Sequence, residues 1–243
     1  MGCSNTEGAG CHGHADPEFM ERMKKLLVSN LNAPSQLWQQ SEWQEFMRTP
    51  ETLKRQQDYG WPRQLAGPLN RNLVNLGRGG DSNSAQVKLL YESDTYTGQD
   101  VLVVFLVTGA ERFSFYRKNS PRSYMPLMAA DITCGPEERL FVEHYVRSQD
   151  LEQGSQREAE FYIRAAEALC QARGWRFVWL PAFSHYDYQG SNRLHPDIRA
   201  YEWLIMPRDF AVCRHPNERG YKIIAENLLA LIKEFYTPGA KNF

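Results

Sequence analysis

The sequence has no long hydrophobic run and almost no net charge, and each absence excludes a class of protein. The longest apolar stretch, residues 101–107, has seven residues, far short of the roughly 20 that span a membrane. A balance of 28 Lys+Arg against 29 Asp+Glu argues against nucleic-acid binding through broad electrostatics. The first residues also lack the apolar segment of a secretory signal. We therefore expect a cytoplasmic protein with neither a membrane nor a nucleic acid as its partner.

Cysteine is scarce and irregularly spaced. Five cysteines, an odd number, do not form a disulfide framework, so a reducing compartment is the better expectation. One group near the N-terminus, Cys3, Cys11, His12 and His14, contains residue types that bind metals. Its C-x₇-C-H-x-H spacing is not an established zinc pattern, and a Gly-rich loop explains it equally well. We predict no metal and no organic cofactor.

The chain has enough apolar material for one sizeable domain. It has 243 residues, of which 42% are hydrophobic and 12% aromatic, and it contains no internal repeat. A single domain over residues 1–243 is the expectation. Its core, rather than a carbohydrate-binding surface, is where we expect five of the six tryptophans: Trp38, Trp43, Trp61, Trp175 and Trp179.

Hydrophobic periodicity indicates alternating strands and helices. Val-rich residues 100–107 predict a parallel strand, and residues 175–180 a second strand. Helices are expected over residues 59–69, 156–173 and 217–235, the second with Gly174 as its C-cap. Shorter segments predict a strand over residues 72–76, helical turns within residues 17–58, and a last strand or buried loop over residues 201–206.

This alternation predicts an α/β domain with a central parallel sheet. In such sheets, chemistry is carried by the loops that follow the carboxyl ends of the strands. The most specific string in those loops is HPNERGY, residues 215–221, directly before the last helix. A histidine held before a helix start suits a general base near neutral pH, and Asn217 can help cap that helix. A surface histidine in a capping turn is the equally weighted alternative.

The string HPNERGYKIIAENLLALI resembles the last conserved block of SGNH/GDSL-type hydrolases, in which the catalytic His precedes Pro and a closing helix. Residues 2–8, GCSNTEG, resemble the first block of that family, in the GCS form of phage and bacterial members. The resemblance implies a three-layer, flavodoxin-like sandwich. It also implies that Ser4 is the nucleophile and His215 its general base, with the Ser4 N–H in the oxyanion hole.

Two further blocks carry the resemblance over about residues 2–235. Residues 73–83, LVNLGRGGDSN, resemble the second block and imply that Gly80 gives an oxyanion N–H. The third block, TGAERF at residues 108–113, lacks the family's Asn, so either Thr108 or Asn83 supplies the third donor or no residue does. Pocket residues are then expected at Glu111, Arg112 and His185, with a purely structural role as the equally weighted alternative for His185.

The chain departs from the family at the orienting carboxylate. Val212 occupies the position three residues before His215 where the family has Asp, and the nearest upstream carboxylate is Asp209. Asp209 would orient the imidazole only if the loop bends back; otherwise a backbone carbonyl does so. The proposed nucleophile also follows only three residues, which leaves no room for the strand that normally precedes it. Either the natural start lies upstream or the sheet lacks that first strand.

Several alternatives stay open. Residues 80–82 spell GDS, which makes Ser82 a rival nucleophile. Residues 1–6 fit an N-myristoylation pattern, which would make the loop a lipid anchor. The two lost family residues favour a non-catalytic accessory or binding protein with the same fold. The leading hypothesis is a serine esterase that acts on a small-molecule or glycan ester, with deacetylation of a glycan implied by the resemblance alone.

Overall fold

A computed structural model describes Glu21, residues 41–77, 81–109, 112–115, 125–128, Leu140, His144, and residues 153–183, 185–205, 208–210 and 215–236. The chain divides into two compact units, which are treated separately below. The sheet unit comprises Met1–Ser4, Asn75–Glu202 and Ala230–Phe243, and the helical unit comprises Asn5–Val74 and Trp203–Leu229. The helices that lie within the described ranges include none with the length and hydropathy needed to cross a membrane.

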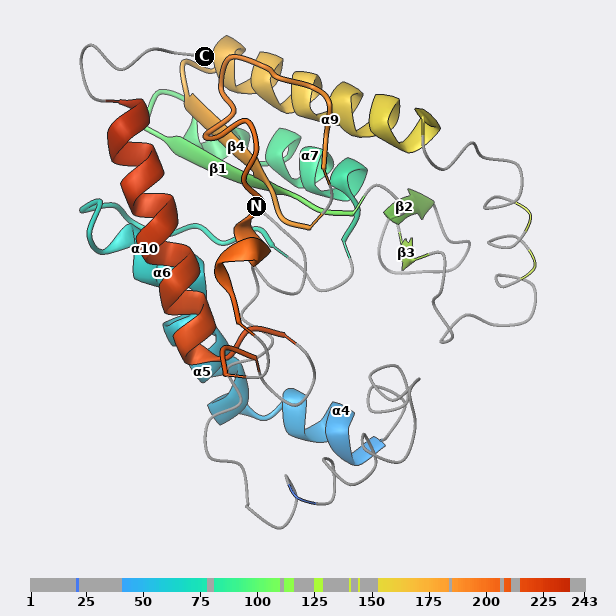
Figure 1. The fold of residues 1–243 in the computed structure, drawn as a ribbon, viewed down its shortest axis with the longest axis vertical. Coiled ribbons are helices and arrows are strands. Elements are labelled where there is room, and N and C mark those ends of the chain that lie inside the picture. Colours follow the sequence, from blue (N-terminus) through green and yellow to red (C-terminus); the bar gives the residue numbers. More distant parts are fainter. Residues whose placement is uncertain are drawn as a thin grey trace. The chain divides into compact units, whose positions relative to one another are not determined.

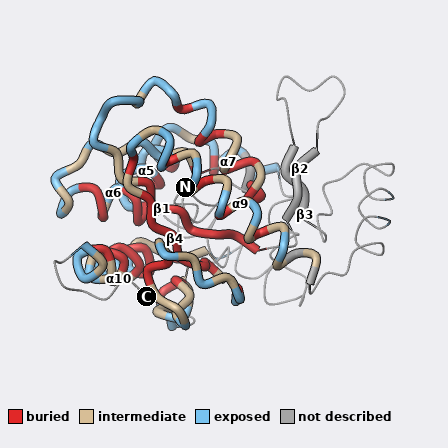
Figure 2. Tube along the Cα trace, turned by 90° about the horizontal axis from the view of Figure 1, so that it is seen from above, coloured by how far each residue is buried: buried red, intermediate tan, exposed pale blue. Residues whose placement is uncertain are grey.

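The sheet unit is built on two parallel strands that lie side by side (Figure 1). β1 (Leu102–Val107) pairs with β4 (Arg176–Pro181) from Leu102 opposite Arg176 to Val107 opposite Pro181. Both expected central strands are therefore confirmed, and the unit is of the α/β class. The two strands are among the most deeply buried segments (Figure 2).

A long helix covers one face of this sheet. α9 (Gln153–Ala172) turns Ala159, Ile163, Ala166 and Cys170 inward, at the i, i+4, i+7 and i+11 positions of one helical stripe. These residues pack against alternate residues of β1, namely Val103, Phe105 and Val107, which share one face of a pleated strand. Trp175 and Trp179 complete this core, as expected. Burial also raises the pKa of the Cys170 thiol to about 12, so the thiol stays protonated and unreactive.

The end of α9 confirms the predicted glycine cap. Gly174 has φ +68°, a conformation that side chains rarely adopt. The Trp175 N–H donates to the Cys170 carbonyl at 2.8 Å and the Gly174 N–H to the Gln171 carbonyl at 3.1 Å. These two bonds form a Schellman motif, which turns the chain directly into β4.

The expected strand over residues 72–76 is wrong. Residues 71–77 form no regular structure, and Val74 is 46% exposed. The Asn75 side chain accepts a hydrogen bond from the Gly77 N–H at 3.0 Å, an Asx turn that competes with strand pairing. After this turn, α7 (Asn83–Tyr91) packs against α9, and neither periodicity nor motif predicted it as a helix. A short 3-10 turn, η1 (Asp94–Tyr96), then leads toward β1.

Two short strands were also not predicted. β2 (Arg112–Phe115) pairs with β3 (Met125–Met128) in an antiparallel sheet. The segment expected as a last strand or buried loop holds instead the 3-10 helix η2 (Ala200–Trp203), followed by an exposed Ile205.

The helical unit contains α4 (Ser41–Met47), α5 (Pro50–Tyr59) and α6 (Trp61–Ala66). The helical turns predicted within residues 17–58 are confirmed from residue 41 onward, and residues 17–20 and 22–40 lie outside the described part of the chain. Pro62 lies in the first turn of α6, where its missing N–H costs nothing. The closing helix is α10 (Glu218–Phe235), whose residues up to Leu229 belong to this unit and whose last turns belong to the sheet unit.

Candidate functional site

The carboxyl end of β1 carries a buried polar cluster. Thr108 follows the strand, and its backbone N–H donates to Oδ1 of Asn83 at 3.0 Å. The Asn83 Nδ2 donates to the Thr108 carbonyl at 3.4 Å. Both residues are buried, so these bonds tie the start of α7 to the strand end without competition from water. The structure thus brings together two of the residues expected at the oxyanion hole.

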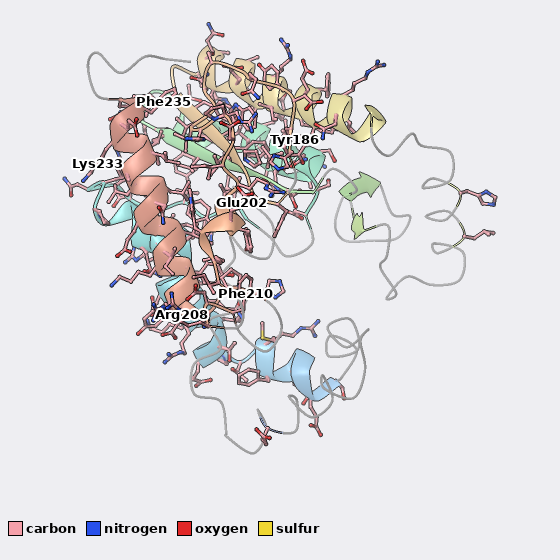
Figure 3. The ribbon with its side chains drawn as sticks, in the orientation of Figure 1. Tyr186, Glu202, Arg208, Phe210, Lys233 and Phe235 are labelled. Carbon is pink, nitrogen blue, oxygen red and sulfur yellow. The ribbon has the colours of Figure 1, made fainter. Side chains whose placement is uncertain are left out.

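Tyr186, which follows β4, completes this cluster. Its hydroxyl donates to the same Thr108 carbonyl, and its ring is almost fully buried (Figure 3). Arg193 in turn donates to the carbonyls of Tyr186 and Tyr188, at 2.9 and 3.1 Å. Backbone groups at the ends of both parallel strands are therefore fixed relative to each other. We call Asn83, Thr108 and Tyr186 the strand-end cluster.

A stack of side chains holds the loop that carries Tyr186. The Tyr188 ring lies parallel to the Trp179 ring, with centroids 5.8 Å apart. Guanidinium groups lie over the two rings, Arg193 over Trp179 at 5.1 Å and Arg164 over Tyr188 at 4.7 Å. Such stacking adds stability beyond the buried area of the rings. The loop after β4 is therefore a rigid support for the strand-end cluster.

Ser82, the rival nucleophile, caps α7. Its Oγ accepts the Ala85 N–H at 3.2 Å and shares a hydrogen bond of 2.8 Å with Ser84 Oγ. The whole residue is buried. An N-cap serine satisfies a helix N–H that would otherwise lack a partner. These contacts give Ser82 a structural role as a helix cap, which accounts for the residue without a catalytic function.

A half-buried carboxylate lies near this cap. Burial raises the pKa of Glu158, and a hydrogen bond from Tyr162 partly offsets the rise. Burial also raises the pKa of Tyr162, which is hydrogen-bonded to Ser84 as well. Tyr162, on α9, is thus linked by side-chain hydrogen bonds both to Glu158 and to Ser84 at the start of α7.

We expect the Glu158 carboxylate to make stability depend on pH. Its pKa is higher in the folded chain than in the unfolded chain, so the folded state binds more protons between the two values. Stability is then greatest below the unfolded pKa of about 4.5 and falls as pH rises through the folded value. Glu158→Gln should flatten this fall in midpoints of thermal unfolding between about pH 4 and pH 8. The exposed Glu226→Gln is the control, and an unchanged slope in Glu158→Gln would contradict the assignment.

His185 lies one residue before Tyr186 and is exposed. Its carbonyl accepts a hydrogen bond from Gln156 Nε2 at 2.7 Å. Hydrogen bonds from Arg199 lower the pKa of the nearby Glu202 carboxyl, and His185 acts in the same direction. His185 is thus placed at the carboxyl end of β4, where a residue lining a pocket was expected.

Asp209, in the helical unit, is fully buried and engaged by neighbours in its own loop and helix. Its Oδ2 accepts the Ile205 N–H at 2.9 Å, and its Oδ1 lies 3.3 Å from Arg208 Nε and 3.1 Å from Arg219 Nε. The Ile205 N–H lowers the pKa of this carboxyl below its usual range, and the two arginines act in the same direction against the opposing effect of burial. Asp209 is therefore ionised at neutral pH, and its carboxylate organises its own turn.

That turn fixes the backbone on both sides of His215. The Asn217 N–H donates to the Asp209 carbonyl at 3.0 Å, and the Asn217 side chain caps α10 by accepting the Gly220 N–H at 3.0 Å. Phe210 and Pro216 form an isolated antiparallel bridge. His215, half-buried, precedes Pro216 directly. The expected cap by Asn217 is confirmed, and the loop does bend back toward Asp209.

Gly220 allows this turn to close. A Cβ at this position would lie well inside van der Waals contact of the Asp209 carbonyl oxygen and 3.0 Å from Pro216 Cβ. The first turn of α10 approaches the preceding loop so closely that only glycine fits. Sequence reasoning did not single out Gly220, although its place in HPNERGY was visible.

Several predicted residues lie outside the described part of the chain. These are Ser4, Gly80, Glu111, and the group Cys3, Cys11, His12 and His14. Arg112 is the first residue of β2, and its side chain is not described. Within the described ranges, no three His, Cys, Asp or Glu side chains are grouped so that they could hold a metal ion.

Two supporting residues of the sheet unit, Tyr186 and Arg193, were not predicted. Tyr186 reaches Thr108 across 78 positions of sequence, and no local pattern marks such a contact. Its place directly after a predicted strand was the one available signal. Comparison with protein-family models, curated proteins and solved structures finds no match to this chain.

Proposed function

We propose that this protein is a serine esterase of the SGNH type that acts on a small-molecule or glycan ester. In this proposal Ser4 is the nucleophile, His215 is the general base, and the N–H groups of Ser4 and Gly80 stabilise the oxyanion. The fold would be the three-layer sandwich of that family around the parallel sheet, and the protein would act in the cytoplasm. No metal or organic cofactor takes part in the proposed reaction.

The observation that carries the proposal is the strand-end cluster. Asn83 and Tyr186 hold the backbone of Thr108 from two sides at the carboxyl end of β1. Polar groups fixed in a buried setting before substrate arrives are what stabilises a developing negative charge. If Thr108 served only to fill the core, an apolar residue at that position would make the folded domain more stable.

The turn around His215 gives independent support. The buried anion Asp209 holds the Ile205 N–H and two arginines, while its carbonyl accepts the Asn217 N–H. These bonds fix the main chain that flanks the histidine. Asp209 therefore acts in this proposal as a positioning residue that works through its backbone contact with Asn217.

The proposed reaction has two balanced steps. In the first, Ser4 Oγ attacks the ester carbonyl carbon while His215 takes the hydroxyl proton, and the alcohol leaves with that proton as the ester C–O bond breaks. In the second, water attacks the acyl-serine, His215 takes a proton from the water, and Ser4 recovers its proton as the acid departs. An oxyanion forms in both steps and needs the same donors.

The test is to incubate the full chain with a short-chain aryl ester and, separately, with a fluorophosphonate probe. Hydrolysis of the ester and a single labelled peptide that contains Ser4 are the expected results. The exposed Ser191, whose Oγ is bonded to Glu167, serves as an internal control and should stay unlabelled. Labelling of Ser82 instead of Ser4 would identify Ser82 as the nucleophile. A chain that neither hydrolyses the ester nor takes up the label would refute the proposed esterase.

A second candidate is a non-catalytic binding protein of the same fold. One observation favours it: both carboxylate oxygens of Asp209 accept from Ile205, Arg208 and Arg219. A carboxylate engaged in this way is less suited to orient an imidazole. The same labelling experiment separates the two candidates, because a non-catalytic binding protein would not react with the fluorophosphonate probe.

A further inference from the structure

We infer that the Thr108 hydroxyl is the third oxyanion donor, in place of the asparagine that the third block lacks, and that Asn83 is its positioning residue. The inference rests on the proposed esterase function and decides between two residues of the strand-end cluster. It assigns different roles to side chains that lie in direct contact, so the roles can be separated by substitution.

The first observation is a buried hydroxyl without a partner. Thr108 is 0% exposed, and within the described part of the chain its Oγ1 has no hydrogen-bond partner. Burial of a hydroxyl without a hydrogen bond is unfavourable, and native proteins rarely keep such a group. A donor that is unused in the resting protein and needed in the transition state accounts for its presence.

The second observation is that Asn83 is already committed. Its Oδ1 accepts the Thr108 N–H at 3.0 Å, and its Nδ2 faces the Thr108 carbonyl at 3.4 Å. One N–H of the Asn83 Nδ2 is not used in these bonds, but turning the amide to aim it at an oxyanion would disturb the Oδ1 bond that satisfies the buried Thr108 N–H. Thr108 Oγ1 can turn toward an oxyanion by rotation about one side-chain bond.

The third observation is that the Thr108 backbone is held from a second direction. The Tyr186 hydroxyl donates to the Thr108 carbonyl, and Arg193 holds the Tyr186 carbonyl at 2.9 Å. With the backbone atoms fixed, the hydroxyl proton can still turn about the Cβ–Oγ1 bond without moving the rest of Thr108. A donor on a fixed backbone loses little freedom when the oxyanion forms, and a water-poor setting strengthens its hydrogen bond.

The test compares Thr108→Val with Thr108→Ser in the full chain. Valine keeps the shape and removes the hydroxyl, whereas serine keeps the hydroxyl. For hydrolysis of the aryl ester we expect Thr108→Val to lower kcat by about 10²–10³-fold with KM nearly unchanged. Thr108→Ser should retain kcat within about tenfold of the original chain.

Thermal unfolding supplies a readout that does not depend on activity. Because the hydroxyl has no partner, Thr108→Val should unfold at the same or a higher temperature, whereas loss of a structural hydrogen bond would lower the midpoint. Asn83→Ala should behave in the opposite way, with a clearly lower midpoint, because it leaves the buried Thr108 N–H without a partner.

The outcomes separate this inference from the proposed function. Ester turnover by Thr108→Val equal to that of Thr108→Ser, or a lower unfolding midpoint in Thr108→Val, would overturn the donor assignment and leave the esterase standing. A chain that neither hydrolyses the ester nor reacts with the fluorophosphonate would overturn both. A loss of kcat at unchanged KM, with stability kept, is the result that supports Thr108 as the donor.

Discussion

Substitution of His215 by asparagine should lower kcat for the aryl ester by about 10⁴–10⁶-fold, the loss expected when the general base of a serine hydrolase is removed. Asparagine is close to histidine in size and polarity but cannot accept the proton of Ser4. The turn itself should persist, because the backbone bonds of Asp209 and Asn217 that flank His215 do not involve its ring. The measurements are kcat and the midpoint of thermal unfolding on the same preparation.

Two matched histidine variants sharpen this test. His195→Asn is the control, because His195 belongs to a turn in which its Nδ1 accepts the Asp197 N–H at 3.1 Å, and asparagine can replace that acceptor. His185→Asn tests the histidine that follows β4, which is exposed beside Glu202. If His185→Asn lost the activity and His215→Asn kept it, the general base would have to be reassigned.

The sequence predicted the parts of the fold whose signal is local and strong. The apolar run of β1, the stripe of α9 and its glycine cap each follow from a few neighbouring residues. The strand expected over residues 72–76 failed because Asn75 satisfies the Gly77 N–H with its own side chain. That bond is also local, so the N-x-G spacing could have favoured a turn over a strand.

The candidate site was less accessible to prediction, because its contacts are long-range. Asn83 and Thr108 were expected near an oxyanion, but which of them is committed depends on bonds between segments 25 positions apart. Tyr186 approaches the same carbonyl from beyond β4. The order of motifs can place such residues at one edge of the sheet. It does not determine which of their hydrogen-bond donors is already bonded within the protein.

The role of Asp209 shows the same limit in the helical unit. Its distance of six positions from His215 raised the question of whether the loop bends back. It does, and the carboxylate meets Ile205, Arg208 and Arg219. Arg219 comes from the first turn of α10, so the contact depends on how that helix approaches the loop. A single glycine controls the approach.

Substitution of Gly220 by alanine should therefore disrupt the turn that carries His215. The added Cβ would overlap the Asp209 carbonyl oxygen and lie 3.0 Å from Pro216 Cβ, so the helix start and the loop must move apart. We expect a loss of about 1–3 kcal/mol in the free energy of unfolding, measured with denaturant. We also expect kcat/KM to fall about 10²-fold at a temperature where the variant stays folded, because small displacements of a catalytic group are costly.

Gly67→Ala is the matched control for this glycine. Gly67 lies at the end of α6 with φ −57°, and a Cβ there would meet no atom within 4 Å. Alanine at that position should change the free energy of unfolding by less than about 1 kcal/mol, in the stabilising direction, because it restricts the unfolded chain. If Gly220→Ala had the same stability and activity as Gly67→Ala, the close contact between α10 and the Asp209 loop would not be needed to position His215. A Gly220→Ala variant that keeps its stability but loses activity would instead show that the loop yields to the methyl group and that His215 moves with it.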